Sequence, residues 1–173
     1  VVRNLGMQGA VTSTAQYSAG LVSSSYGLIE NCYVNVSVSG SRSIGGIVYE
    51  NFAAGVMRNN VFVGSLTETG TAYRAGGIAG VSRVDEEGGY NNVYLTGGDS
   101  TDGKYIVGKR DDALCTAWDA TNALATDFAA FSEANAAMLA TFDTHVWTLD
   151  SGFALNKGCL TTLTANAGEG TEA

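Results

Sequence analysis

A similar short phrase occurs three times in the sequence, as IENCYV at residues 29–34, MRNNVFV at 57–63 and GYNNVYL at 89–95. Each places one or two asparagines before hydrophobic residues, and a related phrase surrounds Asn4. A second set of phrases begins with small residues and glycine, namely SAGLVSS, IGGIVYEN and AGGIAGVS. Both sets recur at intervals of about 26 to 32 residues, which indicates a stack of similar structural units.

Each unit has the pattern of short β-strands joined by tight turns. In CYVNVSVS, residues 32–39, hydrophobic and polar side chains alternate, which predicts a strand with one apolar face. The chain holds 23 glycines and no proline, as many tight turns would require. Gly46 and Gly77 stand just before inward aliphatic residues, where glycine permits a positive φ or a close approach between coils. We therefore expect a mainly β protein, a right-handed parallel β-helix of about four coils over residues 1–112.

Stacked coils would place equivalent side chains in columns along the axis. Leu21, Ile47 and Ile78 would form one aliphatic column. The asparagines, with Asn31 among them, would form another, because an amide both donates and accepts hydrogen bonds. The phrases recur, on this interpretation, because each coil must lie on an equivalent copy of itself.

The paired asparagines of the second and third phrases leave two registers open. Tyr33, Phe62 and Tyr94 stack in one register, whereas Val34 takes the place of Tyr33 in the other. A slip of one residue exchanges the two faces of a strand. Tyr33, Phe62 and Tyr94 are the candidate binding residues, since exposed aromatic rings can stack on sugars.

The composition changes near Cys115, where alanine becomes frequent. The stretch FSEANAAMLATF predicts a short helix with Ser132 as its N-cap. An open coil end needs cover, because an exposed strand edge invites aggregation. We expect residues 113–164 to form a cap or a side-packed lid of short helix and closing strands, and residues 165–173 to form a flexible tail.

Charge and cysteine content exclude several classes of protein. The net charge is −8, which argues against nucleic acid as a partner, and no apolar run is long enough for membrane insertion. Cys32, Cys115 and Cys159 match no zinc or redox spacing and are expected to be core thiols, with a bridge between the last two left open. The chain starts at Val1 rather than methionine, and we expect it to be part of a longer protein.

Acidic residues offer two candidate metal sites. Asp85, Glu86 and Glu87 are adjacent in the loop between the third and fourth units, and carboxylates bind Ca²⁺. Consecutive side chains seldom converge, however, so a solvated loop is the alternative. Asp99 and Asp102 lie in a stretch rich in glycine and serine, which could be either a metal-binding turn or an ordinary turn.

Catalysis has little support in the sequence. His145 is the only histidine, and no Gly-x-Ser-x-Gly elbow accompanies it. Glycoside cleavage needs two carboxyl groups across a cleft, whereas Glu30, Glu50 and Glu68 fall at non-equivalent places in the repeat. We expect a non-catalytic module without a cofactor.

The glycine-led phrases resemble the GLUG-motif repeats of bacterial surface and secreted proteins. The resemblance rests on GGIVYEN, GGIAGVS, AGLVSSS and IENCYV, and covers roughly residues 2–97. VWTLDSGFALNKG resembles the strand pair that closes such repeats, although Ala154 stands where proline is usual.

This resemblance implies an adhesin-like structural module of a larger secreted or cell-surface bacterial protein. Its partners would be host or cell-surface glycans or proteins. A carbohydrate-binding module is the alternative, followed by a polysaccharide-active enzyme, because β-helices host such enzymes. The sequence leaves the oligomeric state open.

Overall fold

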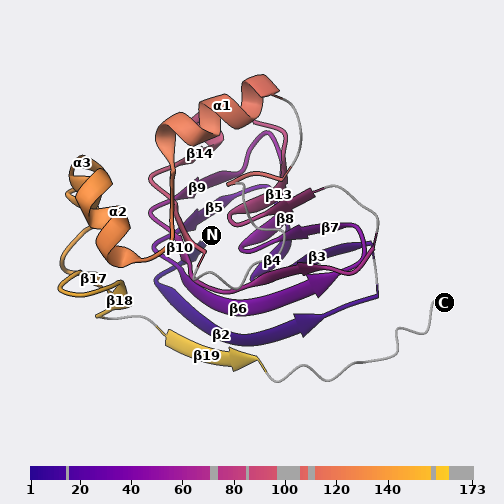
Figure 1. The fold of residues 1–173 in the computed structure, drawn as a ribbon, viewed down its shortest axis with the longest axis horizontal. Helices are drawn as coiled ribbons and strands as arrows, with labels where there is room; N and C mark the ends of the chain where they lie inside the picture. The colour runs from indigo at the N-terminus through magenta and orange to yellow at the C-terminus, as the bar shows by residue number, and fades with distance from the viewer. Residues whose placement is uncertain are drawn as a thin grey trace.

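Parallel strands wind into a β-solenoid of about four coils, as predicted from the repeats (Figure 1). The computed structural model describes residues 1–14, 16–70, 74–84, 86–96, 106–108, 112–156 and 159–163. Asp99 and Asp102 lie outside these ranges, as does the predicted tail.

Equivalent strands recur in every coil. The first coil contains β1 (Val2–Arg3), β2 (Leu5–Thr12), β3 (Tyr17–Ala19) and β4 (Val22–Ser25). The second contains β5 (Leu28–Glu30), β6 (Tyr33–Gly40), β7 (Ser43–Gly45) and β8 (Val48–Asn51). The third contains β9 (Val56–Arg58), β10 (Val61–Phe62), β11 (Leu66–Glu68), β12 (Arg74–Gly76) and β13 (Ala79–Ser82). The last begins with the 3-10 helix η1 (Glu86–Gly88), β14 (Gly89–Tyr90) and β15 (Val93–Leu95).

The strands pair along the axis in four parallel sheets. Their orders are β1-β5-β9-β14, β16-β15-β10-β6-β2-β19 with β11 also on β6, β3-β7-β12 and β4-β8-β13. Each sheet is therefore one side of the solenoid, and each strand lies on its counterpart in the next coil.

The C-terminal part of the chain covers the solenoid at both ends and along one side. Its elements are α1 (Asp112–Thr121), β16 (Ala123–Ala125), α2 (Phe128–Ala134), α3 (Ala136–Leu139), β17 (Trp147–Thr148), β18 (Ala154–Leu155) and β19 (Cys159–Leu163). Helix α1 lies over the last coil, at the top of Figure 1, whereas β19 pairs with β2 at the opposite end. We call residues 126–156 the lid. None of the helices in the described part of the chain has the length and apolar character of a membrane span.

The predicted helix of the lid begins earlier than expected. Asp127, rather than Ser132, is the N-cap of α2, and its side chain accepts a hydrogen bond of 2.8 Å from the Ala130 N–H. Ser132 lies inside α2 and donates to the Ala129 carbonyl instead. Aspartate and serine are comparable N-cap residues, so residue type alone could not decide between Asp127 and Ser132.

The aliphatic column is confirmed and continues by one residue. The Leu21 N–H donates to the Ile47 carbonyl over 3.1 Å, and the Ile47 N–H donates to the Ile78 carbonyl over 3.3 Å. Ile106 extends the column through a bond of 3.0 Å from the Ile78 N–H. Ile47 and Ile78 have no exposed surface.

The structure selects the second of the two predicted registers. Phe62 lies opposite Val34 on one side and Tyr94 on the other, and all three side chains face the interior with 0% exposure. Tyr33 instead lies opposite Val61, on the outer face of the same sheet.

Gly46 and Gly77 are required by close approach rather than by backbone conformation. A Cβ on Gly46 would lie 2.0 Å from the Gly77 carbonyl oxygen and 2.6 Å from the Phe62 ring. A Cβ on Gly77 would lie 2.1 Å from the Tyr94 ring. Among the residues described, Gly9 is the glycine with positive φ, so that explanation does not apply to the predicted pair.

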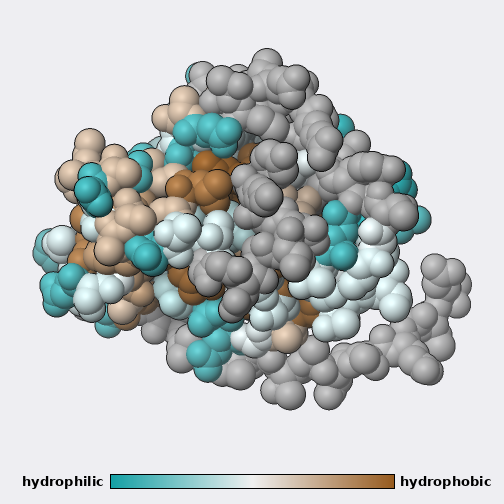
Figure 2. Space-filling model, viewed as in Figure 1, coloured by the Kyte–Doolittle hydropathy of each residue, from teal (hydrophilic) through white to brown (hydrophobic). Residues whose placement is uncertain are grey.

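A second core forms where the lid packs on the outer face of β10 and β15. Val61 and Val93 are fully buried there against the lid. Phe131, Phe153 and Trp147 supply most of the aromatic contacts, and the Trp147 and Phe153 rings meet edge to face at 5.7 Å. In Figure 2 the surface in the region of α2 and α3 is mostly tan, with scattered hydrophilic groups.

Candidate functional site

Asparagine occupies the same corner in every coil. Asn4, Asn31, Asn59 and Asn91 have φ values of 53° or 54°, and they are the non-glycine residues with positive φ among those described. Asparagine tolerates this left-handed conformation better than most residues. Asn31 therefore matches Asn59 and not the next asparagine, and its predicted place in the amide column is wrong.

The second asparagine of each pair forms a buried amide ladder. The backbone N–H and Nδ2 of Asn60 donate to Asn92 Oδ1 over 3.1 and 2.9 Å. The same two groups of Asn92 donate to Asn122 Oδ1 over 2.9 and 2.8 Å. The remaining amide hydrogens reach carbonyls of the preceding coil, such as Met57 O at 2.9 Å. A ladder satisfied in this way fixes the register of successive coils.

Cys32 takes the place of asparagine at the start of this ladder. Its N–H donates to Asn60 Oδ1 over 3.0 Å, and its thiol faces the Glu30 carbonyl at 3.4 Å. Burial raises the pKa of Cys32 to about 11, against a smaller opposite effect of the Leu5 N–H. The thiol is therefore protonated at neutral pH and is a core group rather than a nucleophile. The side chains of Cys115 and Cys159, and hence their possible bridge, lie outside the described residues.

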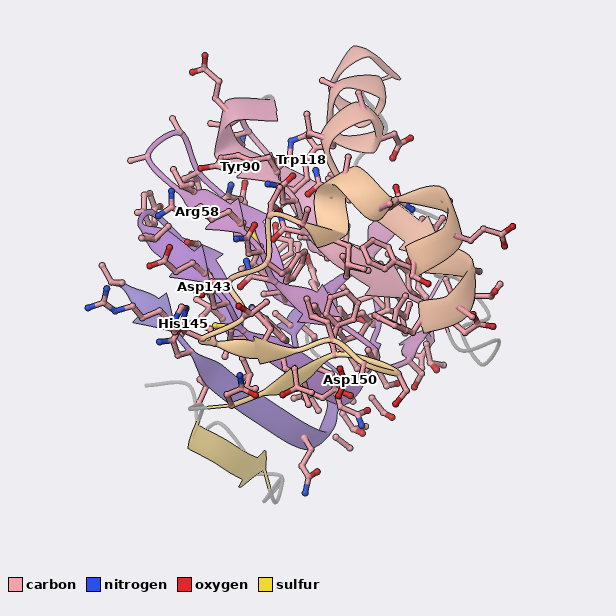
Figure 3. All side chains as sticks on the ribbon, turned by 90° about the vertical axis from the view of Figure 1, so that its left-hand side faces the viewer. Arg58, Tyr90, Trp118, Asp143, His145 and Asp150 are labelled. Carbon is pink, nitrogen blue, oxygen red and sulfur yellow. The ribbon has the colours of Figure 1, made fainter. Side chains whose placement is uncertain are left out.

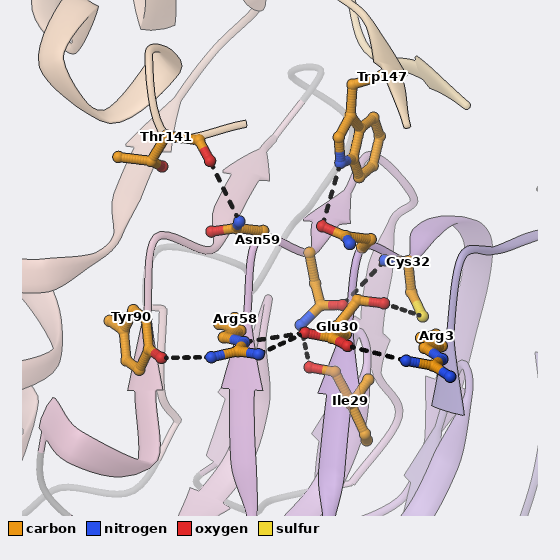
Figure 4. A network of polar contacts seen from close by, with 11 residues as sticks. Arg3, Ile29, Glu30, Cys32, Arg58, Asn59, Tyr90, Thr141 and Trp147 are labelled. Atoms are coloured by element: carbon orange, nitrogen blue, oxygen red, sulfur yellow. Dashed lines mark hydrogen bonds and ion pairs between the residues drawn. The ribbon is translucent and has the colours of Figure 1, made fainter. Parts of the chain in front are cut away.

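A ladder of charges joins the coils on the outer face of the β1-β5-β9-β14 sheet (Figure 4). Glu30 lies between Arg3 and Arg58, and its Oε2 is 2.8 Å from Arg58 Nη2. Arg58 Nη1 also donates to the Tyr90 hydroxyl over 3.1 Å. This bond, together with Glu30, raises the pKa of Arg58 above its ordinary value. The guanidinium of Arg58 thus donates to side chains of the second and fourth coils and links three coils.

Two aromatic stacks lie on the outside of the first two coils. The rings of Tyr17 and Tyr49 are 4.4 Å apart, and those of Tyr26 and Phe52 are 4.3 Å apart with only 7° between their planes. Arg83 of the third coil covers the Phe52 ring at 5.4 Å. Tyr17 and Tyr26 remain 45% and 64% exposed. The orientation of each ring is fixed by its stacking partner in the second coil.

The predicted binding residues do not form a surface site. Phe62 and Tyr94 have no exposed surface, since the register turns them into the core. Tyr33 is half-buried against the lid on the other face, where burial raises its pKa. Among the aromatic residues that the structure describes, Tyr17 and Tyr26 are the most exposed. Alternation alone could not single them out, because Tyr17 is the first residue of β3 and Tyr26 follows the end of β4.

The predicted metal cluster falls mostly outside the described residues. Asp85 and the side chain of Glu86 lie there, whereas Glu87 is exposed in η1. Among the side chains that the structure describes, no three His, Cys, Asp or Glu residues come close enough to share a metal ion.

His145 belongs to a turn of the lid. Its Nδ1 is 3.0 Å from Asp143 Oδ1, and the two side chains lie together at the surface (Figure 3). The His145 N–H and ring both lower the pKa of Asp143. The Asp143 carbonyl accepts from the N–H groups of Val146 and Trp147, so the residue organises the turn that leads into β17.

No protein-family model, curated protein or solved structure matches this chain.

Proposed function

We propose that this protein is a non-catalytic, adhesin-like structural module of a larger secreted or cell-surface bacterial protein. The observation that carries the proposal is the buried ladder of Asn60, Asn92 and Asn122, which locks successive coils in register. A solenoid held in this way is a rigid support on which loops and outer side chains keep fixed positions. The resemblance to GLUG-motif repeats supports the same assignment.

The C-terminal part of the chain adds a second constraint on the coils. The Trp147 indole N–H donates to Asn31 Oδ1, and Asn59 Nδ2 donates to the Thr141 carbonyl, each over 3.4 Å (Figure 4). The Asn91 N–H donates to the Thr121 carbonyl over 2.7 Å. The lid and α1 therefore hold three successive coils at their asparagine corners, which opposes separation along the axis.

Adhesion under load tests this proposal. The chain is displayed on bacterial cells through an inert carrier, and attachment to surfaces coated with glycans or extracellular proteins is measured under flow. Cells with the carrier alone are the control, and release of reducing sugars from the same glycans is measured in parallel. We expect attachment above the control without sugar release. Attachment no higher than the control would contradict the adhesive role, and sugar release would contradict the non-catalytic one.

A carbohydrate-binding module is the second candidate function. It is favoured by the exposure of Tyr17 and Tyr26, whose rings are held by Tyr49 and Phe52 and need no reordering to stack on a sugar. A glycan array separates the two candidates. Binding to a defined neutral oligosaccharide that is lost in Tyr17→Ser and Tyr26→Ser, but kept in the exposed Leu124→Ser control, would establish it.

A further inference from the structure

One asparagine of the sequence begins a glycosylation motif. Of the 12 asparagines, Asn35 alone has serine or threonine two residues later, and Val36 stands between Asn35 and Ser37. The pattern Asn-x-Ser/Thr, with any residue except proline in the middle, is the acceptor sequence for N-linked glycans. So short a pattern also arises by chance, and the surroundings of Asn35 in the fold decide what it can do.

The outer face of β6 presents both polar residues of the motif to solvent. Strand β6 lies between β2 and β10 in its sheet (Figure 1). Asn35 and Ser37 are exposed on this strand, whereas Val36 is buried in the core. Side chains alternate between the two faces of a strand, so the amide and the hydroxyl lie on the same side, two residues apart. The Ser65 hydroxyl donates to the Ser37 hydroxyl oxygen over 3.0 Å, which leaves the Ser37 O–H as a donor.

Asn35 differs from the other asparagines because the fold makes no use of its side chain. The others that the structure describes lie at a corner, in the amide ladder or in a hydrogen bond to a main-chain carbonyl: Asn4, Asn31, Asn59 and Asn91; Asn60, Asn92 and Asn122; Asn51, Asn135 and Asn156, respectively. The side-chain amide of Asn35 has no hydrogen-bond partner within the described ranges. The asparagine that the fold does not require is therefore the one that carries the motif.

The strand surface around Asn35 is uncharged. Gln8 of β2 lies opposite Asn35, and Ala10 lies opposite Ser37. The sequences of β2 and β6 contain no Asp, Glu, Lys or Arg. The chain as a whole has a net charge of −8, and an activated sugar with a diphosphate group is an anion. An uncharged face repels such a donor less than an acidic face would.

We propose that Asn35 is a modification site, to which an oligosaccharyltransferase attaches an N-linked glycan from a lipid-linked diphosphate donor. Asn35 Nδ2 attacks the anomeric carbon of the sugar, and the new N–C bond replaces the C–O bond to the diphosphate. The lipid diphosphate leaves with the bonding electron pair, the amide loses one proton, and neither an oxidant nor a reductant takes part. This inference rests on the proposed secreted or cell-surface location, because lipid-linked glycans are transferred on the outer side of the membrane.

Secretion in the presence of a transferase tests whether Asn35 accepts a glycan. The full chain is exported by bacterial cells that carry an oligosaccharyltransferase for Asn-x-Ser/Thr and a lipid-linked oligosaccharide of known mass. The wild type is compared with Asn35→Gln, Ser37→Ala, Ser37→Thr and the control Ser39→Ala, which changes the same strand outside the motif. We expect the intact mass to rise by one glycan in the wild type, Ser37→Thr and Ser39→Ala, and to stay unchanged in the other two. Fragmentation of the wild-type glycopeptide locates the glycan without any mutation, should a variant fail to fold.

The protein from its own cells tests whether the modification occurs there. Protease treatment of intact cells measures its location, and peptide mass mapping measures the occupancy of Asn35. We expect accessible protein with a glycan on Asn35. Accessible protein without this glycan would overturn the inference and leave the proposed function intact, whereas inaccessible, unmodified protein would contradict both. An unmodified wild type in the transferase strain, or a glycan on another residue, would also overturn the inference.

Discussion

Asn91 and Asn92 are adjacent and chemically identical, yet their environments predict opposite responses to mutation. Asn91 has a φ of 54° at a coil corner, whereas Asn92 is fully buried within the amide ladder. We expect Asn92→Ala to destabilise the fold by about 3–5 kcal/mol. We expect Asn91→Gly to change the free energy of unfolding by less than about 0.5 kcal/mol, because glycine adopts a positive φ without strain.

The larger value follows from the hydrogen bonds of Asn92. Its Oδ1 accepts from the N–H and Nδ2 of Asn60, and its Nδ2 donates to Met57 O and Asn122 Oδ1. Each bond contributes about 1 kcal/mol net, and alanine removes all four. The Asn60 N–H then remains buried without this partner. This unsatisfied donor is itself destabilising, so the loss of stability should not fall much below the sum of the four bonds. Asn91→Ala provides an intermediate case, since a left-handed alanine costs roughly 1–2 kcal/mol.

Guanidinium unfolding at 25 °C measures these differences, with Trp118 and Trp147 as fluorescent probes and far-UV circular dichroism as the second. The midpoint should fall strongly for Asn92→Ala, moderately for Asn91→Ala and hardly for Asn91→Gly. A loss below about 1 kcal/mol for Asn92→Ala would show that the ladder does not hold the register. Equal losses for Asn91→Gly and Asn92→Ala would refute the division of roles within the pair.

Three further predictions concern the core and the outer ladder. Gly46→Ala should destabilise by about 3 kcal/mol or more because its Cβ would meet a carbonyl oxygen and a ring, whereas Gly27→Ala, with nothing within 4 Å, should be nearly neutral in the same unfolding assay. The folded-state pKa of Cys32 is about 11 against an ordinary 9.0, so the unfolded chain loses this proton first. Stability should therefore fall between pH 9 and 11 relative to Cys32→Ala, measured as midpoints at each pH. Glu30→Gln should cost only about 0.5–1 kcal/mol, since Arg58 is 41% exposed, and less in 1 M NaCl.

The repeat spacing was sufficient to predict the solenoid and its aliphatic column. Leu21, Ile47 and Ile78 could be aligned because parallel coils place like residues on like, and the glycine phrases around them are unambiguous. The asparagine phrases were ambiguous because two physical requirements select the same residue type. One is the left-handed corner and the other is the buried ladder.

The second coil contains the signal that resolves this ambiguity. Its asparagine phrase has a single asparagine, Asn31, followed by Cys32, so only one of the two requirements can be met there by asparagine. A corner with positive φ tolerates few residue types, whereas the ladder position can be filled by a small buried thiol. Alignment of Asn31 with Asn59 follows, and this alignment turns Phe62 and Tyr94 inward.

A cap or side-packed lid was predicted for this segment, but not which sheet it covers, although the strand sequences indicate it. The second-coil strand YVNVSVS alternates between apolar and polar residues, whereas NVFV and NVYL are apolar on both faces. Strands that are apolar on both faces indicate burial on both faces, and Val61 and Val93 are indeed covered by the lid. The pairing of β19 with β2 had no such trace, because it joins the two ends of the chain and each strand is compatible with many partners.

The glycine phrases and the asparagine phrases recur together because their residues meet in the core. The glycine phrase of one coil faces the aromatic position of the next: Gly20 approaches Val34, Gly46 approaches Phe62 and Gly77 approaches Tyr94. A Cβ on Gly20 would be 3.3 Å from the valine methyl, but on Gly77 only 2.1 Å from the tyrosine ring. The first position nevertheless has no more room than the last, because a Cβ on Gly20 would also lie 2.2 Å from the Gly46 carbonyl oxygen, so all three positions exclude a side chain. The glycine and asparagine phrases are therefore one coupled unit, in which the large ring of one coil is accommodated by the missing side chain of the coil before it.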